Sequence, residues 1–232
     1  MSDDAENDPA ARIRDGRAWG DFCDRMKAAG ERVAAAAPDD DFDRAEGPRY
    51  VARLAAHFLR TSIDEADPAA AVLSTTSPKI GLDNPDYVYA GARLSPRFAY
   101  RLRIEPNDAH LLGVGLFSGG LGTPQGLVRD AYATSDELER SADGAFEIAI
   151  ARERRPGNWL AMGAHTNSLN IRQTLLRRRE QRPARCELVR TDAGPPPAPL
   201  DPAAFAQVLD RTAAMVEGVV AEFLGWAESF PA

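Results

Sequence analysis

The sequence predicts an α+β fold: an antiparallel β-sandwich or jelly roll with two N-terminal helices and one long C-terminal helix. Helical periodicity is confined to the two ends of the 232-residue chain. Between the ends, six to eight segments of alternating apolar and polar residues are separated by turn residues, with no helical segment between them. That order favours antiparallel layers over a parallel α/β sheet, and the chain is long enough to bury a substantial core.

The same patterns divide the chain into regions. Its first residues are rich in Asp, Glu and Asn and have little to bury, which is typical of a disordered segment. A stiff run of prolines precedes the last helix. We expect a disordered tail at 1–12, the N-terminal helices at 13–61, the sandwich at 62–190, a proline-rich linker at 191–200, and a C-terminal helix at 201–232 that packs on the same domain or on a dimer partner.

Three helices are predicted from apolar residues that recur every three or four positions. The first covers 17–36, where Trp19 and Phe22 begin the apolar stripe. The second covers 47–60, with Pro48 in its first turn. In the third, Asp201 caps a helix that reaches about residue 229 and spans ~40 Å.

The centre of the predicted sandwich is a pair of alternating runs, 87–94 and 98–105, separated by Ser95-Pro96-Arg97. This spacing predicts an antiparallel hairpin with one core face and one polar, aromatic and cationic face. The second face is suitable for binding a ligand, because tyrosine offers an aromatic ring with a hydroxyl group and arginine offers a rigid set of hydrogen-bond donors. It equally suits an ordinary solvated sheet face.

Further strands are expected downstream. In the run 110–118, Gly113 and Gly115 leave one face nearly flat, which invites close approach by another backbone or a ligand. Alternation also places Phe146 in a core-facing strand, and Trp159 in the short strand that follows is most simply a core residue. The remaining predicted strands lie at about 127–132, 145–151, 157–160, 168–175 and 184–190.

Composition excludes several classes of partner. The net charge of −7 argues against nucleic acid, whose phosphates the average field would repel. No apolar run approaches the ~20 residues that span a bilayer, and the N-terminus is acidic, so we expect a cytoplasmic protein without a membrane partner. Cys23 and Cys186 show no metal or redox spacing and are expected to be buried, reduced thiols.

The chain lacks the sequence signatures of metal, nucleotide and serine-hydrolase sites, so we expect no metal and no cofactor. What remains is acid–base chemistry by side chains from the polar sheet faces. Such roles need groups within hydrogen-bond reach of one reacting atom. The candidates are Tyr89 or Tyr100 as proton donor, Arg101 or Arg172 as anion stabiliser, and Asp86 or Glu147 as base.

An ordered set of motifs resembles the bacterial family called domain of unknown function 1214. The matching pieces are EGPRYVARL at 46–54, GLDNPDYVYAGARL at 81–94, AYRLRI at 99–104, DGAFEIAI at 143–150, PGNWLAM at 156–162 and SLNIRQTLLRRREQRPARCELVR at 168–190. The resemblance implies a sandwich or jelly-roll fold but no particular activity. The chain departs from the family pattern after IRQ, where Leu176 is followed by three arginines.

Three functions are compatible with the sequence. The first is a cofactor-free lyase or a similar acid–base enzyme, of isomerase or hydrolase type, that acts on a small, mostly apolar aromatic or lipid-like molecule. The second is a non-catalytic ligand-binding or assembly module, with a homodimer through the terminal helices. The third is a carbohydrate-binding jelly roll, which three tryptophans without an obvious shared platform make less suitable. A hollow between the sheets would favour the enzyme, and an interior filled by side chains would favour the assembly module.

Overall fold

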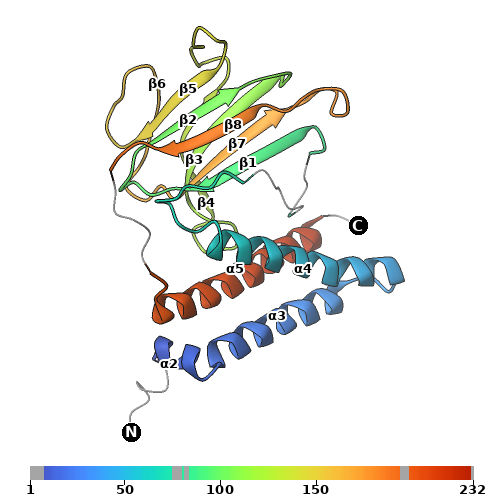
Figure 1. Ribbon diagram of the computed structural model, residues 1–232. Helices are drawn as coiled ribbons and strands as arrows, with labels where there is room; N and C mark the ends of the chain where they lie inside the picture. The colour runs from blue at the N-terminus through green and yellow to red at the C-terminus, as the bar shows by residue number, and fades with distance from the viewer. Residues whose placement is uncertain (1–7, 75–79, 81–83, 194–198, 231–232) are drawn as a thin grey trace. The chain divides into compact units, whose positions relative to one another are not determined.

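The chain folds into two compact units, one of helices and one of strands (Figure 1). The structure, a computed structural model, describes residues 8–74, 80, 84–193 and 199–230. The helices and the loop Leu121–Gly126 form the helical unit, and the segments Glu65–Gly120 and Leu127–Pro197 form the sandwich unit. The predicted α+β class, with a β-sandwich and a long C-terminal helix, is confirmed.

The helical unit is organised around its last helix. Its elements are α2 (Pro9–Arg14), α3 (Arg17–Ala36), α4 (Asp41–Ile63) and α5 (Pro202–Ser229). Helix α5 packs against each of the other three (Figure 1). The Asp201 side chain accepts hydrogen bonds from the backbone N–H groups of Ala203 and Ala204, which confirms the predicted cap. Phe22 and Leu209 belong to the shared apolar cluster.

Two boundaries at the N-terminus differ from the prediction. Pro9 begins α2 because the Asp8 carboxylate caps it, so the predicted tail is wrong for residues 9–12, and residues 1–7 lie outside the described part. Helix α4 starts at Asp41 rather than near residue 47, because Asp40 accepts hydrogen bonds from the N–H groups of two first-turn residues. Pro48 therefore lies inside the helix, where it removes one backbone hydrogen bond.

One loop packs on α5 through glycine. Gly122 has a φ of +71°, and a Cβ built on it would lie 2.6 Å from the carbonyl oxygen of Met215. A Cβ built on Gly218 would lie 1.9 Å from the carbonyl oxygen of Gly122. The loop backbone and the helix backbone therefore touch at a point where neither residue has room for a side chain.

The sandwich unit contains two four-stranded sheets. Sheet A has the order β1-β7-β3-β4 and sheet B the order β6-β5-β2-β8. Every pairing is antiparallel except that of β5 with β6, which is parallel. The strands are β1 (Tyr87–Arg93), β2 (Tyr100–Glu105), β3 (Leu111–Gly119), β4 (Leu127–Thr134), β5 (Phe146–Ala151), β6 (Asn158–Ala161), β7 (Ser168–Thr174) and β8 (Arg185–Arg190).

The predicted central hairpin is wrong. Strand β1 pairs with β7 in sheet A, whereas β2 pairs with β5 and β8 in sheet B. The segment between the strands carries the chain from one sheet to the other: Leu94 donates its N–H to the Asn167 carbonyl, and Ser95 donates its N–H to the Tyr100 hydroxyl. Alternation identifies the faces of a strand but not its neighbours, which are set by distant segments.

The space between the sheets is filled with side chains. Leu102, Ile148 and Ile171 are fully buried in one apolar cluster that both sheets share. The cluster of buried residues is Ala90, Leu94, Tyr100, Leu102, Ile104, Leu112, Val114, Leu116, Phe146, Ile148, Ile150, Leu160, Met162, Leu169, Ile171 and Leu188. The predicted inward faces of these strands are therefore confirmed.

The flat strip on β3 is occupied by the protein itself. A Cβ on Gly113 would lie 2.0 Å from the Tyr132 hydroxyl oxygen, and a Cβ on Gly115 would lie 2.7 Å from the Phe117 ring. The rings of Tyr132 and Phe117 thus cover the space that the two glycines leave open. The expectation that another backbone or a ligand approaches this strip closely is wrong, because aromatic side chains of the protein cover it.

Two further observations complete the fold. Trp159 is half-buried rather than a core residue, and its indole N–H donates to the Ala151 carbonyl at 3.1 Å. Half of the predicted linker at 191–200, residues 194–198, lies outside the described part. None of the helices in the described ranges combines the length and the hydropathy needed to cross a lipid bilayer.

Candidate functional site

The six candidate residues do not form one site. Tyr89 on β1 and Arg172 on β7 are opposite each other in sheet A. Arg101 on β2 and Glu147 on β5 lie on neighbouring strands of sheet B. A reaction that needs the tyrosine, an arginine and the glutamate at one atom is therefore not supported by this arrangement, because the groups stand on separate sheets.

Tyr100 is unsuited to proton donation. Its side chain is 2% exposed and belongs to the core between the sheets. The hydroxyl donates to the Pro68 carbonyl at 2.9 Å and accepts the Ser95 N–H at 3.0 Å. Burial raises the pKa of this phenol to about 12, so it is a weaker acid than a free tyrosine. The sequence placed it on the core face of its strand, and burial follows from that position.

Asp86 has a structural role. It lies exposed in the turn before β1, where its N–H donates to the side-chain oxygen of Asn84 at 2.9 Å. Its carbonyl accepts the Leu175 N–H at 2.8 Å, which joins the turn to the end of β7. This geometry is that of an Asx turn, in which the Asn84 side chain binds the backbone two residues further on.

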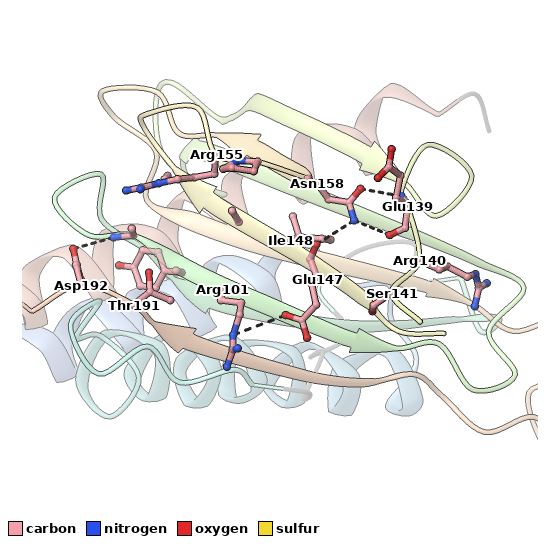
Figure 2. A pocket seen from close by; sticks show the side chains of 16 residues that line it. Arg101, Glu139, Arg140, Ser141, Glu147, Ile148, Arg155, Asn158, Thr191 and Asp192 are labelled. Atoms are coloured by element: carbon pink, nitrogen blue, oxygen red, sulfur yellow. Dashed lines mark hydrogen bonds and ion pairs between the residues drawn. The ribbon is translucent and has the colours of Figure 1, made fainter. Parts of the chain in front are cut away.

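A hollow of about 640 Å³ lies on the outer face of sheet B (Figure 2). Its floor contains the small side chains of Ala149 and Ala151, and Ala149 is directly opposite Arg101 in the sheet register. The loop before β6 and the segment 139–141 form parts of its wall. The volume falls in the range of small-molecule sites, although the hollow is open to solvent.

Glu147 is held within the hollow by an arginine network. Arg103 donates from Nη1 to Glu147 Oε1 at 2.8 Å and from Nη2 to Asp143 Oδ2 at 2.7 Å. The Arg103 guanidinium lowers the pKa of Asp143 to about 2. The second oxygen of Glu147, Oε2, is buried, accepts no hydrogen bond from the described residues, and lies 3.9 Å from Arg101 Nε (Figure 2).

The rim of the hollow is fixed by backbone hydrogen bonds. The Asn158 amide donates to the carbonyls of Glu139 and Glu147 at 2.8 and 3.1 Å, and its oxygen accepts the Glu139 N–H at 2.8 Å (Figure 2). At the other end, Asp192 Oδ2 accepts the Ala99 N–H at 3.0 Å. The motif residue Asn158 is thus a clamp between two segments that line the hollow.

Sequence reasoning found Arg101 and Glu147 but missed Arg155, Asn158 and Asp192. The three missed residues come from a loop, a strand start and the segment after β8, and only the tertiary fold brings them together. One signal was present in the sequence. Ala149 and Ala151 alternate with large apolar residues, so the outer face of β5 carries small side chains at these positions.

A second cluster lies on the outer face of sheet A. The Arg172 guanidinium carbon is 5.1 Å from the Tyr87 ring centroid and 5.6 Å from that of Tyr89. The two rings meet edge to face with centroids 6.0 Å apart. The predicted polar, aromatic face is therefore present, but its arginine comes from β7 rather than from β2.

No group of three or more metal-ligating side chains gathers anywhere in the ranges that the structure describes. Cys186 is half-buried, and burial raises the pKa of its thiol to about 11, which disfavours the reactive thiolate. Cys23 is exposed, so the expectation that both thiols are buried is wrong for this residue. The exposed side of α3 carries it.

Comparisons with known proteins show the fold and no activity. No protein-family profile matches the chain, and no curated protein matches it. A solved structure of an uncharacterised protein from Burkholderia cenocepacia is 38% identical, with a TM-score of 0.87 over 94% of this chain. The chain spans 61% of that protein's length. The VPA0106 protein from Vibrio parahaemolyticus is 11% identical over 67% of this chain and 46% of its own length, and its TM-score of 0.37 supports no argument.

Proposed function

We propose that the protein is a ligand-binding module whose sandwich holds a small hydroxylated organic anion in the hollow on sheet B. The observation that carries this proposal is the unused hydrogen-bonding capacity of that hollow. Glu147 Oε2 accepts no hydrogen bond, and Arg101 donates none, within the described residues. An anionic ligand would satisfy the exposed Arg101 donors, and a ligand hydroxyl would satisfy the buried Glu147 Oε2 once the Arg101 side chain, 3.9 Å away, turns towards the anion.

The charges in the hollow favour an anion. Three arginines and three carboxylates line it. The Glu147 carboxylate is paired with Arg103, and Asp192 accepts a backbone N–H and lies 3.4 Å from the Arg190 guanidinium. Arg155 has no hydrogen bond or ion pair among the described residues and is exposed. Arg101 and Arg155 therefore keep unused guanidinium donors among the described residues, and guanidinium groups bind carboxylates and phosphates in a planar, bidentate geometry.

Binding is favoured over the acid–base enzyme that the sequence suggested. The interior of the sandwich contains a packed core, and the candidate donors and bases stand on separate sheets or are used in turns. A dry cavity in which a carboxylate changes its affinity for protons is the setting that acid–base catalysis needs. The open hollow on sheet B does not supply that setting.

The test uses matched probes. The full-length protein is titrated with tartrate, succinate and glycerol, and its melting temperature is recorded. Tartrate carries both carboxylates and hydroxyls, whereas succinate lacks the hydroxyls and glycerol lacks the charge. A ligand at 100 times its Kd stabilises the native state by about 2.7 kcal/mol. We expect tartrate to raise the melting temperature most, and Arg101→Gln and Glu147→Gln to reduce that shift.

Arg178→Gln is the matched control, because Arg178 is exposed and lies outside the residues that line the hollow. Equal shifts for tartrate and glycerol, or an undiminished tartrate shift in both hollow variants, would contradict the proposal. Chemical conversion of a bound probe, seen by NMR and abolished by Glu147→Gln, would restore the enzyme hypothesis.

Membership in the domain of unknown function 1214 family is part of the same proposal. The roles of its motif residues support it. Gln173, in IRQ, is 2% exposed and both accepts the Ala184 N–H at 2.7 Å and donates to the Ala184 carbonyl at 3.4 Å. With Asn158 in PGNWL, it holds irregular segments against strands. Such contacts would stabilise a fold that family members share, and they do not determine which ligand each member binds.

Self-association through the helices is also proposed. Trp19 on α3 is 57% exposed, and Phe42 on α4 is 72% exposed. Contiguous exposed apolar patches mark surfaces that another chain covers, whereas single exposed side chains are ordinary, so the proposed dimer requires these two residues to contribute to one interface. Light scattering across a concentration series tests for the dimer, and Trp19→Ser should weaken it.

A further inference from the structure

The outer face of sheet A contains an arginine, Arg172, whose guanidinium lies against tyrosine rings and has no ion pair within the described ranges. Arg172 lies on β7, opposite Tyr89 of β1 on one side and Gly113 of β3 on the other. Tyr87 and Tyr89 flank its guanidinium at 5.1 and 5.6 Å. Rings attract the cation through their electron-rich faces but accept few of its N–H groups.

No carboxylate pairs with Arg172 among the residues that the structure describes. Some other arginines of the sandwich are paired with carboxylates, as Arg103 is with Asp143 and Arg182 with Asp108. The outward positions of β1, β7 and β3 contain no acidic residue, and Asp86, in the turn before β1, forms no ion pair with Arg172. The guanidinium donors of Arg172 are therefore available to a ligand from solvent.

Tyr132 borders the arginine on the opposite side. Its hydroxyl lies over Gly113, the residue directly across from Arg172. Arg129 in turn lies 5.6 Å from the Tyr132 ring centroid and adds a second positive charge to the face. Tyrosine hydroxyls and a guanidinium fork thus stand in one row across β1, β7, β3 and β4. The row provides hydrogen-bond donors together with flat aromatic surface.

We propose that Tyr87, Tyr89, Arg172 and Tyr132 form a second binding site, which takes a small aromatic carboxylate. The carboxylate would occupy the fork of Arg172, whose planar geometry fits two oxygens. The ring of the ligand would lie against the tyrosines, which prefer offset or edge-to-face contacts. An anion suits a face whose outward positions on β1, β7 and β3 carry arginines and no acid; the acid on β4, Asp130, accepts hydrogen bonds from Ser118 and Thr166. This site does not depend on the hollow on sheet B.

The experiment titrates the full-length protein with benzoate and follows binding by NMR line broadening of the benzoate ring protons. Phosphate and benzamide are the matched probes, since the first keeps the negative charge without the ring and the second keeps the ring without the charge. We expect benzoate to bind most tightly. Arg172→Gln should weaken benzoate binding by about tenfold or more, the typical effect of losing a charged hydrogen-bond pair.

Two further variants separate the contributions. Arg172→Lys keeps the charge but loses the fork, so it should bind benzoate more weakly than the wild type and more tightly than Arg172→Gln. Tyr89→Phe keeps the ring and should retain most of the affinity. Arg185→Gln, on the exposed part of β8 in sheet B, is the control and should bind as the wild type does.

Three results would overturn the proposal. The first is benzoate affinity that Arg172→Gln leaves unchanged. The second is tighter binding of phosphate or benzamide than of benzoate. The third is benzoate binding that Arg101→Gln abolishes while Arg172→Gln does not, which would place the anion in the hollow on sheet B. Because Arg172 is exposed and makes no hydrogen bond among the described residues, its variants are expected to fold, and circular dichroism verifies this.

Discussion

The contact between Gly218 and the loop Leu121–Gly126 determines whether Gly218→Ala stabilises or destabilises the protein. In the interior of a helix, Gly→Ala ordinarily stabilises by about 1 kcal/mol, because alanine has the higher helix propensity. At Gly218 the added methyl would lie 1.9 Å from the Gly122 carbonyl oxygen and 2.8 Å from the Gly122 Cα. These are backbone atoms, so the loop itself must move.

We expect Gly218→Ala to destabilise the protein by about 1–2 kcal/mol. An overpacked site costs about 1–3 kcal/mol, and the propensity gain offsets part of that cost. Gly225→Ala, in the same helix, is the matched control because a Cβ there meets nothing within 4 Å. That variant should be as stable as the wild type or more stable by up to about 1 kcal/mol.

Urea denaturation followed by far-ultraviolet circular dichroism measures both variants, since most of the helical signal comes from the unit that contains the contact. The two variants should separate by about 2 kcal/mol. Equal stability of Gly218→Ala and Gly225→Ala would refute the reasoning, because it would mean that the loop does not rest on α5 at Gly218.

Two other predictions concern the sandwich. Tyr100→Phe should destabilise it by about 1–3 kcal/mol in urea denaturation, because the Pro68 carbonyl and the Ser95 N–H lose their partner in a buried site; a loss near zero would show that water replaces the hydroxyl. The lowered pKa of Asp143 predicts a pH effect: stability from its pairing with Arg103 is present above the unfolded value of 3.8 and is lost as the pH falls through about 2. The stability difference between wild type and Asp143→Asn should vanish below about pH 2, and a difference that persists there would contradict the pairing.

Local patterns predicted most of the elements. The boundaries of α3 and α5 follow from apolar spacing and from the Asp201 cap, and the inward faces of β2, β5 and β7 follow from alternation. Helix α4 was predicted too short because Pro48 resembled a first-turn proline. The cap that starts the helix is Asp40, seven residues earlier than the predicted first helical residue.

The local sequence patterns could not predict which strands pair with each other. A turn-like segment after Leu94 suggested a hairpin, but the chain crosses there between sheets, and β1 finds its partner in β7 about eighty residues later. The candidate site failed for the same reason. Alternation correctly placed Tyr89 and Glu147 on outward strand faces. Which outward residues are neighbours depends on the pairing of strands that are distant in sequence.

The helical unit has a further consequence for the order in which the protein forms on the ribosome. Helices α2, α3 and α4 are made before the sandwich, whereas the helix that contacts all three, α5, is made after it. The apolar faces of the early helices therefore emerge without their partner while the whole sandwich is being translated. A nascent chain in that condition is a natural client for chaperones that shield exposed apolar surface.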